Sequence, residues 1–299
     1  MQKIPKERDP VVLADWMERQ ALYSGINHCS FEELKSIMEV DGTLAEEALK
    51  SEVQPDALSE QLIVHTEKEI RRRKYIVKKA YPFNISEGVL YASAAKKYLS
   101  YIFCLLISDR EYYSSGDLHS PKLFEHLVGE ASKSYLGGEA LRFGAFRKPP
   151  VPIGIFEAID YLALYTGNEK LRDGYPVNAI DKDLGLDIVA WKFFPDKYWG
   201  KVELYIQCTT EQEWEASKGK LILDKWRNIL RLPFNPIEGL AIPYVLPPEE
   251  WLRQAGILVL DRLRIASVLK SRKLPDDIIN WWKWCQARLS QARQSLSLH

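Results

Sequence analysis

Residues 185–209, GLDIVAWKFFPDKYWGKVELYIQCT, contain two apolar segments separated by turn-forming residues. The first segment, 185–193, is almost continuously apolar, as expected for a strand that is buried on both faces. The second segment, 202–209, alternates between apolar and polar residues, as expected for a strand with one apolar face. Proline, aspartate and glycine residues between them favour a turn. The stretch therefore predicts a β-hairpin near the centre of a sheet.

Each predicted strand carries a polar side chain among apolar neighbours. Asp187 lies in the first strand, where a carboxylate is costly to bury unless it is paired or binds a metal ion. Gln207 lies near the end of the second strand. Two alternatives stay open: Asp187 pairs with an arginine such as Arg142 or caps a neighbouring element, and Gln207 is an ordinary buried hydrogen-bonding residue. Two polar side chains on neighbouring central strands nevertheless indicate a functional site.

The sequence Gly-Leu-Asp-Ile-Val-Ala-Trp, followed after a turn by Tyr-Ile-Gln-Cys, resembles the core of the PD-(D/E)XK nuclease superfamily. It is most similar to the Mrr-type restriction endonucleases, in which an Asp on one strand and a Gln on the next bind a divalent metal ion. Asp187 and Gln207 match these two positions. The family places a Lys two residues after the second position, where this chain has Thr209. Some members carry that Lys on the following helix, where this chain has Lys218 and Lys220.

The resemblance implies an α+β fold with a restriction-endonuclease-like αβββαβ core and a nuclease activity that depends on Mg²⁺ or Mn²⁺. The implied metal ligands are the Asp187 carboxylate, the Gln207 carboxamide and the backbone carbonyl of Cys208. Glu157, on the predicted helix before the hairpin, is the candidate for a further acidic group, because the family often takes a Glu from that helix. Lys218 would stabilise negative charge or orient a water molecule. Glu157 and Lys218 also fit an ordinary role as solvent-exposed helix residues.

The charge balance bears on DNA binding. Lys plus Arg and Asp plus Glu both number 41, so the formal net charge is zero. Proteins that bind DNA unaided usually carry a basic surplus, so zero net charge indicates a local basic patch, a partner protein that delivers the nucleic acid, or a protein that binds no nucleic acid. The candidate nucleic-acid contacts lie in a predicted helix and in a basic, aromatic loop: Arg71, Arg72, Arg73 and Lys74, and Arg142, Arg147 and Lys148. Charge runs of this kind are also common on solvated helix surfaces.

Local signals divide the chain into three parts: a helical N-terminal region (1–120), the nuclease-like core (121–272) and a C-terminal helix (273–299). Loop-forming residues in 109–138 place the first boundary. No first strand of the αβββαβ core is visible in the sequence, and we expect it in 167–183.

Capping signals shape the prediction for the N-terminal region. Ser30-Phe-Glu-Glu33 has the pattern of a capping box. A helix is predicted from Pro55 to about residue 80, where Tyr81-Pro82 ends it. Asn84-Ile-Ser-Glu87 predicts the start of a further helix, whose apolar face would extend to Leu105.

The four cysteines are far apart in the sequence and predict neither a zinc site nor a disulfide framework. The first residues lack an apolar signal region. The longest apolar segment, 98–107, is much shorter than the ~20 residues needed to cross a bilayer. We therefore expect a cytoplasmic protein without membrane association, and the sequence indicates no oligomeric state.

Together these patterns predict a metal-dependent deoxyribonuclease. The resemblance implies a role in defence against foreign DNA, including antiviral defence, and is compatible with an effector that works with a partner protein. The alternative is a catalytically inactive nuclease-fold module that binds nucleic acid or protein, which Gln207 and Thr209 at motif positions favour. A purely helical adaptor is a further alternative, which the alternation in 202–209 disfavours.

Overall fold

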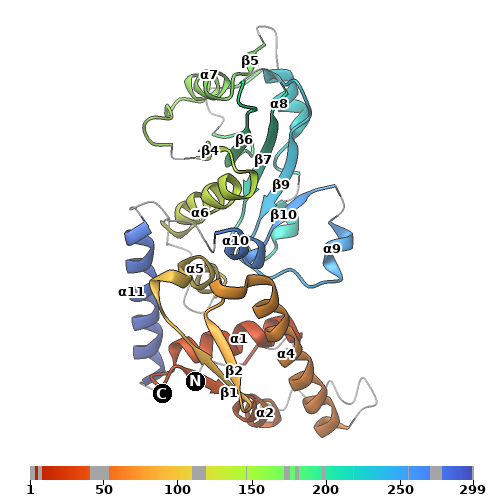
Figure 1. Cartoon of the computed structure of the whole chain (residues 1–299), viewed down its shortest axis with the longest axis vertical. Helices are drawn as coiled ribbons and strands as arrows, with labels where there is room; N and C mark the ends of the chain where they lie inside the picture. The colour runs from red at the N-terminus through yellow and green to blue at the C-terminus, as the bar shows by residue number, and fades with distance from the viewer. Residues whose placement is uncertain are drawn as a thin grey trace. The chain divides into compact units, whose positions relative to one another are not determined.

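The computed structural model describes residues 4–5, 9–40, 54–109, 119–145, 147–171, 176–178, 182–196, 200–217, 219–254, 256–269 and 278–297. The chain forms two compact units. Unit 1 comprises Met1–Ser114 and Lys273–His299, and unit 2 comprises Ser115–Arg272. Helices and sheets occur in both units, which confirms the predicted α+β class (Figure 1).

Unit 1 packs helices around a small antiparallel sheet with the strand order β1-β3-β2. Its strands are β1 (His28–Ser30), β2 (Phe83–Ser86) and β3 (Val89–Ala92). Its helices are α1 (Pro10–Tyr23), α2 (Phe31–Val40), α4 (Pro55–Val77), α5 (Leu99–Ile107) and α11 (Ile278–Ser297), with the 3-10 helices η1 (Lys78–Ala80) and η2 (Lys96–Tyr98). The C-terminal helix α11 is grouped with unit 1.

The predicted capping signals in unit 1 have different outcomes. Ser30 and Glu33 form the capping box, because each side chain accepts a hydrogen bond from the backbone N–H of the other residue. The predicted helix start at Asn84 is wrong, because residues 83–92 form the β2–β3 hairpin. Glu87 and Gly88 both have positive φ, at 50° and 73°, which is the backbone of a tight two-residue hairpin turn.

Unit 2 is built on a five-stranded mixed sheet with the strand order β10-β9-β7-β6-β4. Its strands are β4 (Glu139–Arg142), β6 (Ile188–Lys192), β7 (Val202–Cys208), β9 (Ile237–Ala241) and β10 (Leu258–Leu260). The first three are antiparallel to one another, and β7, β9 and β10 are parallel. Around the sheet lie α6 (His119–Leu136), α7 (Ile155–Thr166), η3 (Trp214–Ser217), α8 (Leu223–Ile229), α9 (Glu250–Arg253) and α10 (Arg262–Leu269).

In chain order, α6, β4, β6, β7, α8 and β9 give helix, three strands, helix, strand, with α7 and β5 inserted between β4 and β6, η3 before α8, and β8 after it. The β6–β7 hairpin lies where the opening stretch predicts it. The first strand is β4, so its predicted location in 167–183 is wrong. Residues Glu169–Lys170 instead form β5, which pairs with β8 (Leu230–Arg231) in a separate two-stranded sheet. An edge strand of four residues with Leu141 as its only buried residue gives almost no hydrophobic pattern to detect.

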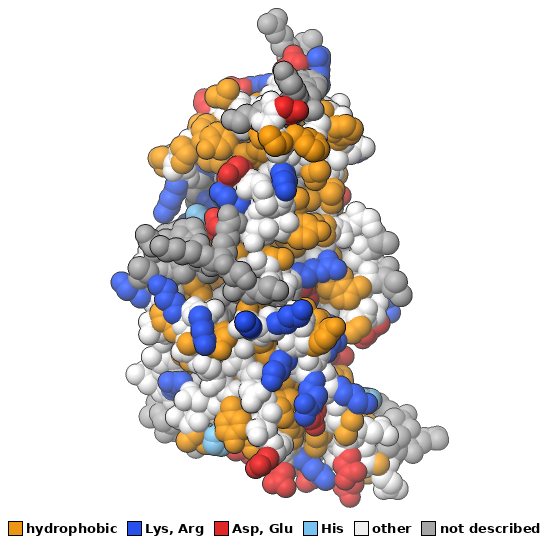
Figure 2. Space-filling model, viewed as in Figure 1, with side chains coloured by type: hydrophobic (Ala, Val, Ile, Leu, Met, Phe, Trp, Pro, Cys, Tyr) orange, Lys and Arg blue, Asp and Glu red, His pale blue; other side chains and the backbone are white. Residues whose placement is uncertain are grey.

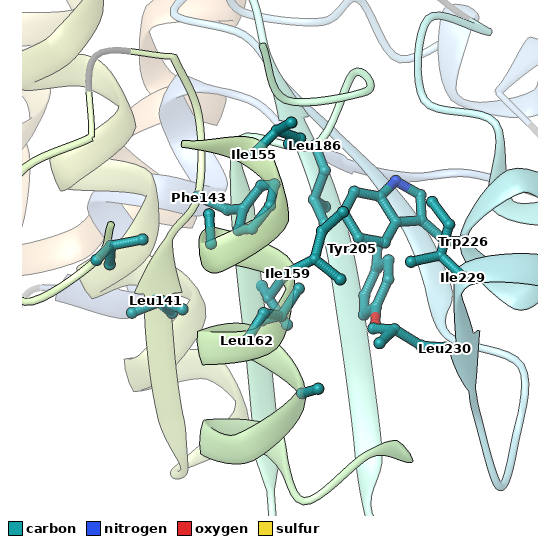
Figure 3. Close-up of a cluster of buried hydrophobic side chains, with 14 of the residues drawn as sticks. Leu141, Phe143, Ile155, Ile159, Leu162, Leu186, Tyr205, Trp226, Ile229 and Leu230 are labelled. Atoms are coloured by element: carbon teal, nitrogen blue, oxygen red, sulfur yellow. The ribbon is translucent and has the colours of Figure 1, made fainter. Parts of the chain in front are cut away.

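Helices cover both faces of the central strands. On one face, Tyr205 of β7 packs against Trp226 of α8, with ring centroids 5.9 Å apart, and side chains of α7 close the cluster (Figure 3). On the other face, α6 packs against β6, and Gly129 lies opposite the Ile188 side chain. Because both faces are covered, a polar group at the end of β6 or β7 is removed from most of the solvent.

Candidate functional site

Asp187 lies immediately before β6, and its backbone forms hydrogen bonds to β7 and to the residues that follow β4. Its N–H donates to the Ile206 carbonyl of β7 (3.0 Å), and its carbonyl accepts from the N–H groups of Phe143 (2.7 Å) and Gly144 (3.0 Å), which follow β4. One carboxylate oxygen accepts a hydrogen bond from the Cys208 N–H at 2.7 Å. The Asp187 side chain thus replaces a ladder bond between β6 and β7 and is held at a fixed position.

Glu125 of α6 supplies a second carboxylate at this place. It accepts a hydrogen bond from Nε of Arg142 at 2.5 Å, and Arg142 also donates to the Ala145 carbonyl at 2.8 Å. Glu125 is not among the predicted site residues, because the sequence of β4 does not reveal it as the first strand. Once β4 is known, α6 is the helix that precedes the three strands, and Glu125 is an acidic residue on it.

The two carboxylates converge over the backbone of Gly144. A Cβ atom built on Gly144 would lie 2.7 Å from Oδ1 of Asp187 and 2.9 Å from Oε2 of Glu125. Both distances are shorter than a carbon atom tolerates, so a side chain at this position would displace the acidic groups. Gly144 therefore leaves the space that the pair shares.

Burial and mutual repulsion disfavour charge on both acids. Burial raises the pKa of Asp187 well above its usual value; the carboxylates of Glu125 and Asp183 raise it further, and the Cys208 N–H and Arg142 act against them. Burial likewise raises the pKa of Glu125 to about 7, although Arg142 opposes this. Like charges held together in a desolvated place are stabilised by a bound cation.

Cys208 of β7 faces this acidic pair with its thiol. Burial raises the pKa of the Cys208 thiol well above its usual range, and Asp187 and Glu125 raise it further, so the thiol stays protonated. The N–H and carbonyl of one strand residue point toward the same neighbouring strand. Since the Cys208 N–H points to Asp187, its carbonyl faces the same side, as a metal ligand at this place requires.

Gln207 lies between Ile206 and Cys208 and is 7% exposed. Side chains alternate along a strand, so Gln207 shares the face of Tyr205, which packs on α8, and not the face of the Cys208 thiol. The hydrogen bond that Asp187 receives from β7 comes from the Cys208 backbone and not from the Gln207 carboxamide.

Thr209, two residues after Gln207, is linked to Lys220 through the hydroxyl group of Ser217. The Thr209 hydroxyl lies 3.4 Å from the Ser217 hydroxyl, which accepts a hydrogen bond from Nζ of Lys220 at 3.1 Å. The backbone of Lys220 also lies directly against Gly185, which has φ of 77° and would clash if it carried a Cβ atom. The ammonium group of Lys220 is therefore held close to the place where the family motif has its Lys. Lys218 lies outside the described residues.

Glu157 is placed apart from the acidic pair. It lies in the first turn of α7, is exposed, and its carboxylate folds back over Gly154 at the start of the same helix. The charged groups that act on the Asp187 pKa are Glu125, Asp183 and Arg142. The structure thus brings Glu125, and not Glu157, to Asp187.

Arg73 was predicted to contact nucleic acid, and this prediction is wrong. Its side chain is fully buried in unit 1 and donates to Asp15 (2.6 Å), Glu69 (2.8 Å) and the Val11 carbonyl (2.8 Å). A guanidinium group with these partners stabilises the packing of α4 on α1 and is closed to phosphate.

The guanidinium group of Arg147 is likewise hydrogen-bonded inside unit 2. Its guanidinium donates to the backbone carbonyls of Phe143, Lys182, Pro152 and Ile153 at 2.6–3.0 Å. It joins two loops beside the acidic pair, so its predicted phosphate contact is also wrong.

The remaining predicted nucleic-acid contacts differ in whether their charged groups are paired with acidic side chains. Arg142 is bound to Glu125. Arg71 and Arg72 pair with Glu67 and Glu69 on their own helix. The two lysines of this set are exposed: Lys74 and Lys148.

The donor set fits a hard divalent cation in part. Within the described residues, no group of three or more His, Cys, Asp or Glu side chains is placed to hold a metal ion. Two converging carboxylates and one backbone carbonyl are oxygen ligands of the kind that Mg²⁺ prefers, and Mg²⁺ usually keeps several water ligands. The space over Gly144 lies where these groups meet.

Comparison with known proteins adds little to this geometry. No protein-family model and no curated protein matches the chain. Among solved structures, it is similar to one described as MspJI Restriction Endonuclease in Complex with 27-mer Oligonucleotide, with 11% sequence identity and a TM-score of 0.23. The match covers 60% of this chain and 36% of that chain. A TM-score of this size does not establish a shared fold.

A membrane-spanning segment was not expected. In the part of the chain that the structure describes, no helix combines the length and the apolar composition needed to cross a bilayer.

Proposed function

We propose that unit 2 hydrolyses phosphodiester bonds of DNA in a reaction that depends on Mg²⁺ or Mn²⁺. One observation carries the proposal: Asp187 and Glu125 converge over Gly144, at the end of β6 in a helix–three strands–helix–strand arrangement. The resemblance of the Asp187 segment to the PD-(D/E)XK motif gives the same chemistry from the sequence. Glu125 takes the role that the sequence analysis gave to Glu157.

Asp187, Glu125 and the Cys208 carbonyl would hold the cation. A bound divalent cation supplies charge neutralisation at the scissile phosphate and a water molecule of lowered pKa. Gln207 remains a predicted ligand, which a change of its rotamer or a bridging water molecule would have to bring to the site.

The other polar side chains have roles that do not depend on metal coordination. Arg142 orients the Glu125 carboxylate through the hydrogen bond from Nε. Lys220 is the candidate to stabilise negative charge on the phosphate, since Ser217 links its ammonium group to Thr209, which holds the motif position of the Lys. Lys218 keeps its predicted role and is the second lysine to test.

Cleavage of supercoiled plasmid DNA by the full chain tests this proposal. We expect nicking in Mg²⁺ or Mn²⁺ that EDTA abolishes, and a loss of at least about a hundredfold in Asp187→Asn and Glu125→Gln, comparable to removal of one transition-state contact. Glu157→Gln is the matched control, because it changes an exposed acid of the same unit and should leave the rate unchanged. Wild-type rates in Asp187→Asn, or a loss in Glu157→Gln alone, would contradict the assignment.

Cation binding can be measured without catalysis. Mn²⁺ should raise the melting temperature of the wild-type chain, because a ligand that binds only the folded state stabilises it. The rise should vanish in Asp187→Asn and persist in Glu157→Gln.

A second candidate function is an inactive nuclease-fold module. It is favoured by Thr209 at the position of the motif Lys and by Gln207, whose face of β7 is covered by α8. Such a module would bind DNA or protein, with no cleavage in any divalent cation. Lys220→Gln separates the two functions. It should lower the rate of DNA cleavage if the chain is an active nuclease, whereas an inactive module shows no cleavage to lower.

The proposed biological role is defence against foreign DNA, including antiviral defence, with the chain as effector beside a partner protein. If the purified chain does not cut, the assay should be repeated in lysate. Activity that appears there and still requires Asp187 would indicate a partner-dependent nuclease.

A further inference from the structure

Unit 1 carries a strong local excess of positive charge in a chain that is neutral as a whole. Residues 68–98 contain nine Lys and Arg but only two Glu. The three arginines of this segment pair with acidic side chains. The remaining charge is therefore carried by lysines, and their placement decides what it can do.

The β2–β3 hairpin brings two pairs of lysines to one end of the unit. The 3-10 helix η1 precedes β2, and η2 follows β3. Phe83, the first residue of β2, pairs with Ala92, the last residue of β3, and the Ser93 N–H donates to the Pro82 carbonyl at 2.9 Å. The segment before β2 and the segment after β3 are consequently adjacent at the open end of the hairpin. The segment before β2 contains η1, and the segment after β3 leads into η2.

We define the lysine face as Lys74 at the end of α4, Lys78 and Lys79 of η1, and Lys96 and Lys97 of η2. All five side chains are exposed. Within the described residues, none of them forms an ion pair with a carboxylate. Figure 2 shows Lys and Arg side chains gathered over the α4 and β2–β3 part of unit 1. A cluster of exposed, unneutralised lysines repels itself unless an anionic partner binds to it.

The backbone conformation of Lys78 also indicates a functional surface. Lys78 has φ of 55° and ψ of −122°, a conformation that glycine adopts easily and that a residue with a side chain adopts at a cost. Residues held in such conformations cluster at functional positions. A lysine at a position suited to glycine, at the end of a helix where the dipole favours positive charge, is consistent with a use for its ammonium group.

Tyrosines accompany the lysines. The Lys97 ammonium lies 4.8 Å from the centre of the Tyr98 ring. Tyr75, at the end of α4, is 79% exposed, and Tyr91 of β3 is 46% exposed. Tyrosine hydroxyls and lysines are common donors to DNA phosphates, whereas binding in a membrane surface relies on large apolar side chains beside the charges.

We propose that the lysine face binds the phosphate backbone of duplex DNA without sequence preference. The choice of DNA rests on the proposed function of unit 2, but the surface belongs to unit 1 and its binding does not require cleavage. It would supply the affinity for DNA that a net charge of zero does not provide.

Binding should be measured by fluorescence anisotropy with a labelled duplex of 20 base pairs over a range of KCl concentrations. The full chain is used as Asp187→Asn in EDTA, so that the DNA stays intact. The test variant is Lys79→Gln with Lys96→Gln. The control is Lys35→Gln with Lys283→Gln, which removes the same charge from unit 1 outside the lysine face; Lys283 is exposed, and Lys35 is half-buried and lies 3.5 Å from Glu60.

The test variant should bind about 10- to 60-fold more weakly at 0.1 M salt, because each lost phosphate contact removes about 0.9 from the slope of log K against log salt. Its slope should be shallower by about 2, with the control close to the parent chain. An equal loss in both variants, an unchanged slope, or stronger binding of duplex RNA or anionic lipid vesicles than of duplex DNA would overturn the proposal.

Lys78→Gly separates binding from folding. It places glycine in the conformation that glycine prefers, so the chain should melt at a higher temperature and yet bind DNA less tightly. Tighter binding in this variant would overturn the role of Lys78. The binding measurement is independent of cleavage. A chain that binds through the lysine face but never cuts DNA contradicts only the nuclease proposal. A chain that cuts DNA but binds it equally well in both double variants contradicts only the proposal of a DNA-binding lysine face.

Discussion

At the scale of single residues, Gly144 limits what the acidic pair can hold. In Gly144→Ala the new Cβ would lie within 3 Å of oxygens on both Asp187 and Glu125, so the carboxylates must separate. We expect loss of the Mn²⁺-dependent rise in melting temperature and a destabilisation of about 1–3 kcal/mol from overpacking. The measurement is thermal unfolding with and without Mn²⁺.

Gly129→Ala is the matched control for this substitution. Its Cβ would meet Ile188 at 3.7 Å, an ordinary van der Waals contact, and alanine is favoured over glycine in a helix by about 1 kcal/mol. This variant should be as stable as the wild type or more so, and it should keep the response to Mn²⁺. An unchanged Mn²⁺ response in Gly144→Ala would show that the pair does not share a cation over Gly144.

The pKa of Glu125 makes stability depend on pH. In the folded chain Glu125 keeps its proton up to about pH 7, whereas the unfolded chain loses it near 4.5. Between these values the folded state binds more protons, so the free energy of unfolding falls as pH rises, by on the order of 2–3 kcal/mol in total. Asp187, whose pKa is also raised, acts in the same direction. Thermal unfolding between pH 4.5 and 8 should show a decline that is smaller in Glu125→Gln.

Saturating Mg²⁺ should reduce this decline in the wild type, because a cation replaces the proton between the two acids. Glu157→Gln should follow the wild-type curve. A Glu125→Gln chain with the full wild-type slope would place the titrating group elsewhere.

At the scale of elements, the sequence was most informative where burial repeats along a strand. The run before Phe193 and the alternation after Val202 specify β6 and β7, because a side-chain period of two and a continuous apolar run leave few other structures. Asp187 was found for the same reason, since a carboxylate in an apolar strand requires an explanation. Its proposed role comes from the resemblance to the nuclease motif, whereas the neighbouring Glu125 and Arg142 could not be identified from that motif.

Elements with weak periodicity were missed or misassigned. The edge strand β4 has one buried residue, and without this strand the helix that carries Glu125 could not be assigned to the core. Residues 84–87 have the residue types of a capping box but form the end of β2 and the first turn residue, because the positive φ values of Glu87 and Gly88 turn the chain back on itself. A capping pattern is local, whereas the pairing of β3 with β1 and β2 depends on residues far apart in the sequence.

Arg73 shows how helix α4 is anchored, and it gives a prediction at this scale. Arg73→Met removes the buried cation that Asp15, Glu18 and Glu69 share. Removing one partner of a buried ionic group typically costs 3–5 kcal/mol, so we expect a destabilisation of about that size by urea unfolding. Arg71→Met, at an exposed pair with Glu67, should change stability by less than about 1 kcal/mol. Similar effects in the two variants would contradict the buried network.

At the scale of the whole molecule, the proposals divide the work between the two units: the lysine face of unit 1 binds DNA, and the acidic pair of unit 2 cuts it. Kinetics on the full chain can separate these contributions, since loss of uniform binding raises KM with kcat unchanged, and loss of a contact made only in the transition state lowers kcat. Lys79→Gln with Lys96→Gln should raise KM for duplex DNA about 10- to 60-fold at 0.1 M salt and leave kcat near the wild-type value.

Glu125→Gln should show the reverse pattern, with kcat lowered by at least about a hundredfold and KM little changed. Higher salt should raise KM steeply in the wild type and in Glu125→Gln, and less steeply in the lysine variant. Because the substitutions are in different units and act on different steps, their effects on kcat/KM should multiply in the triple variant. A kcat that falls with the lysine substitutions would mean that the lysine face acts in the chemical step, and the division between a binding unit and a cutting unit would then be wrong.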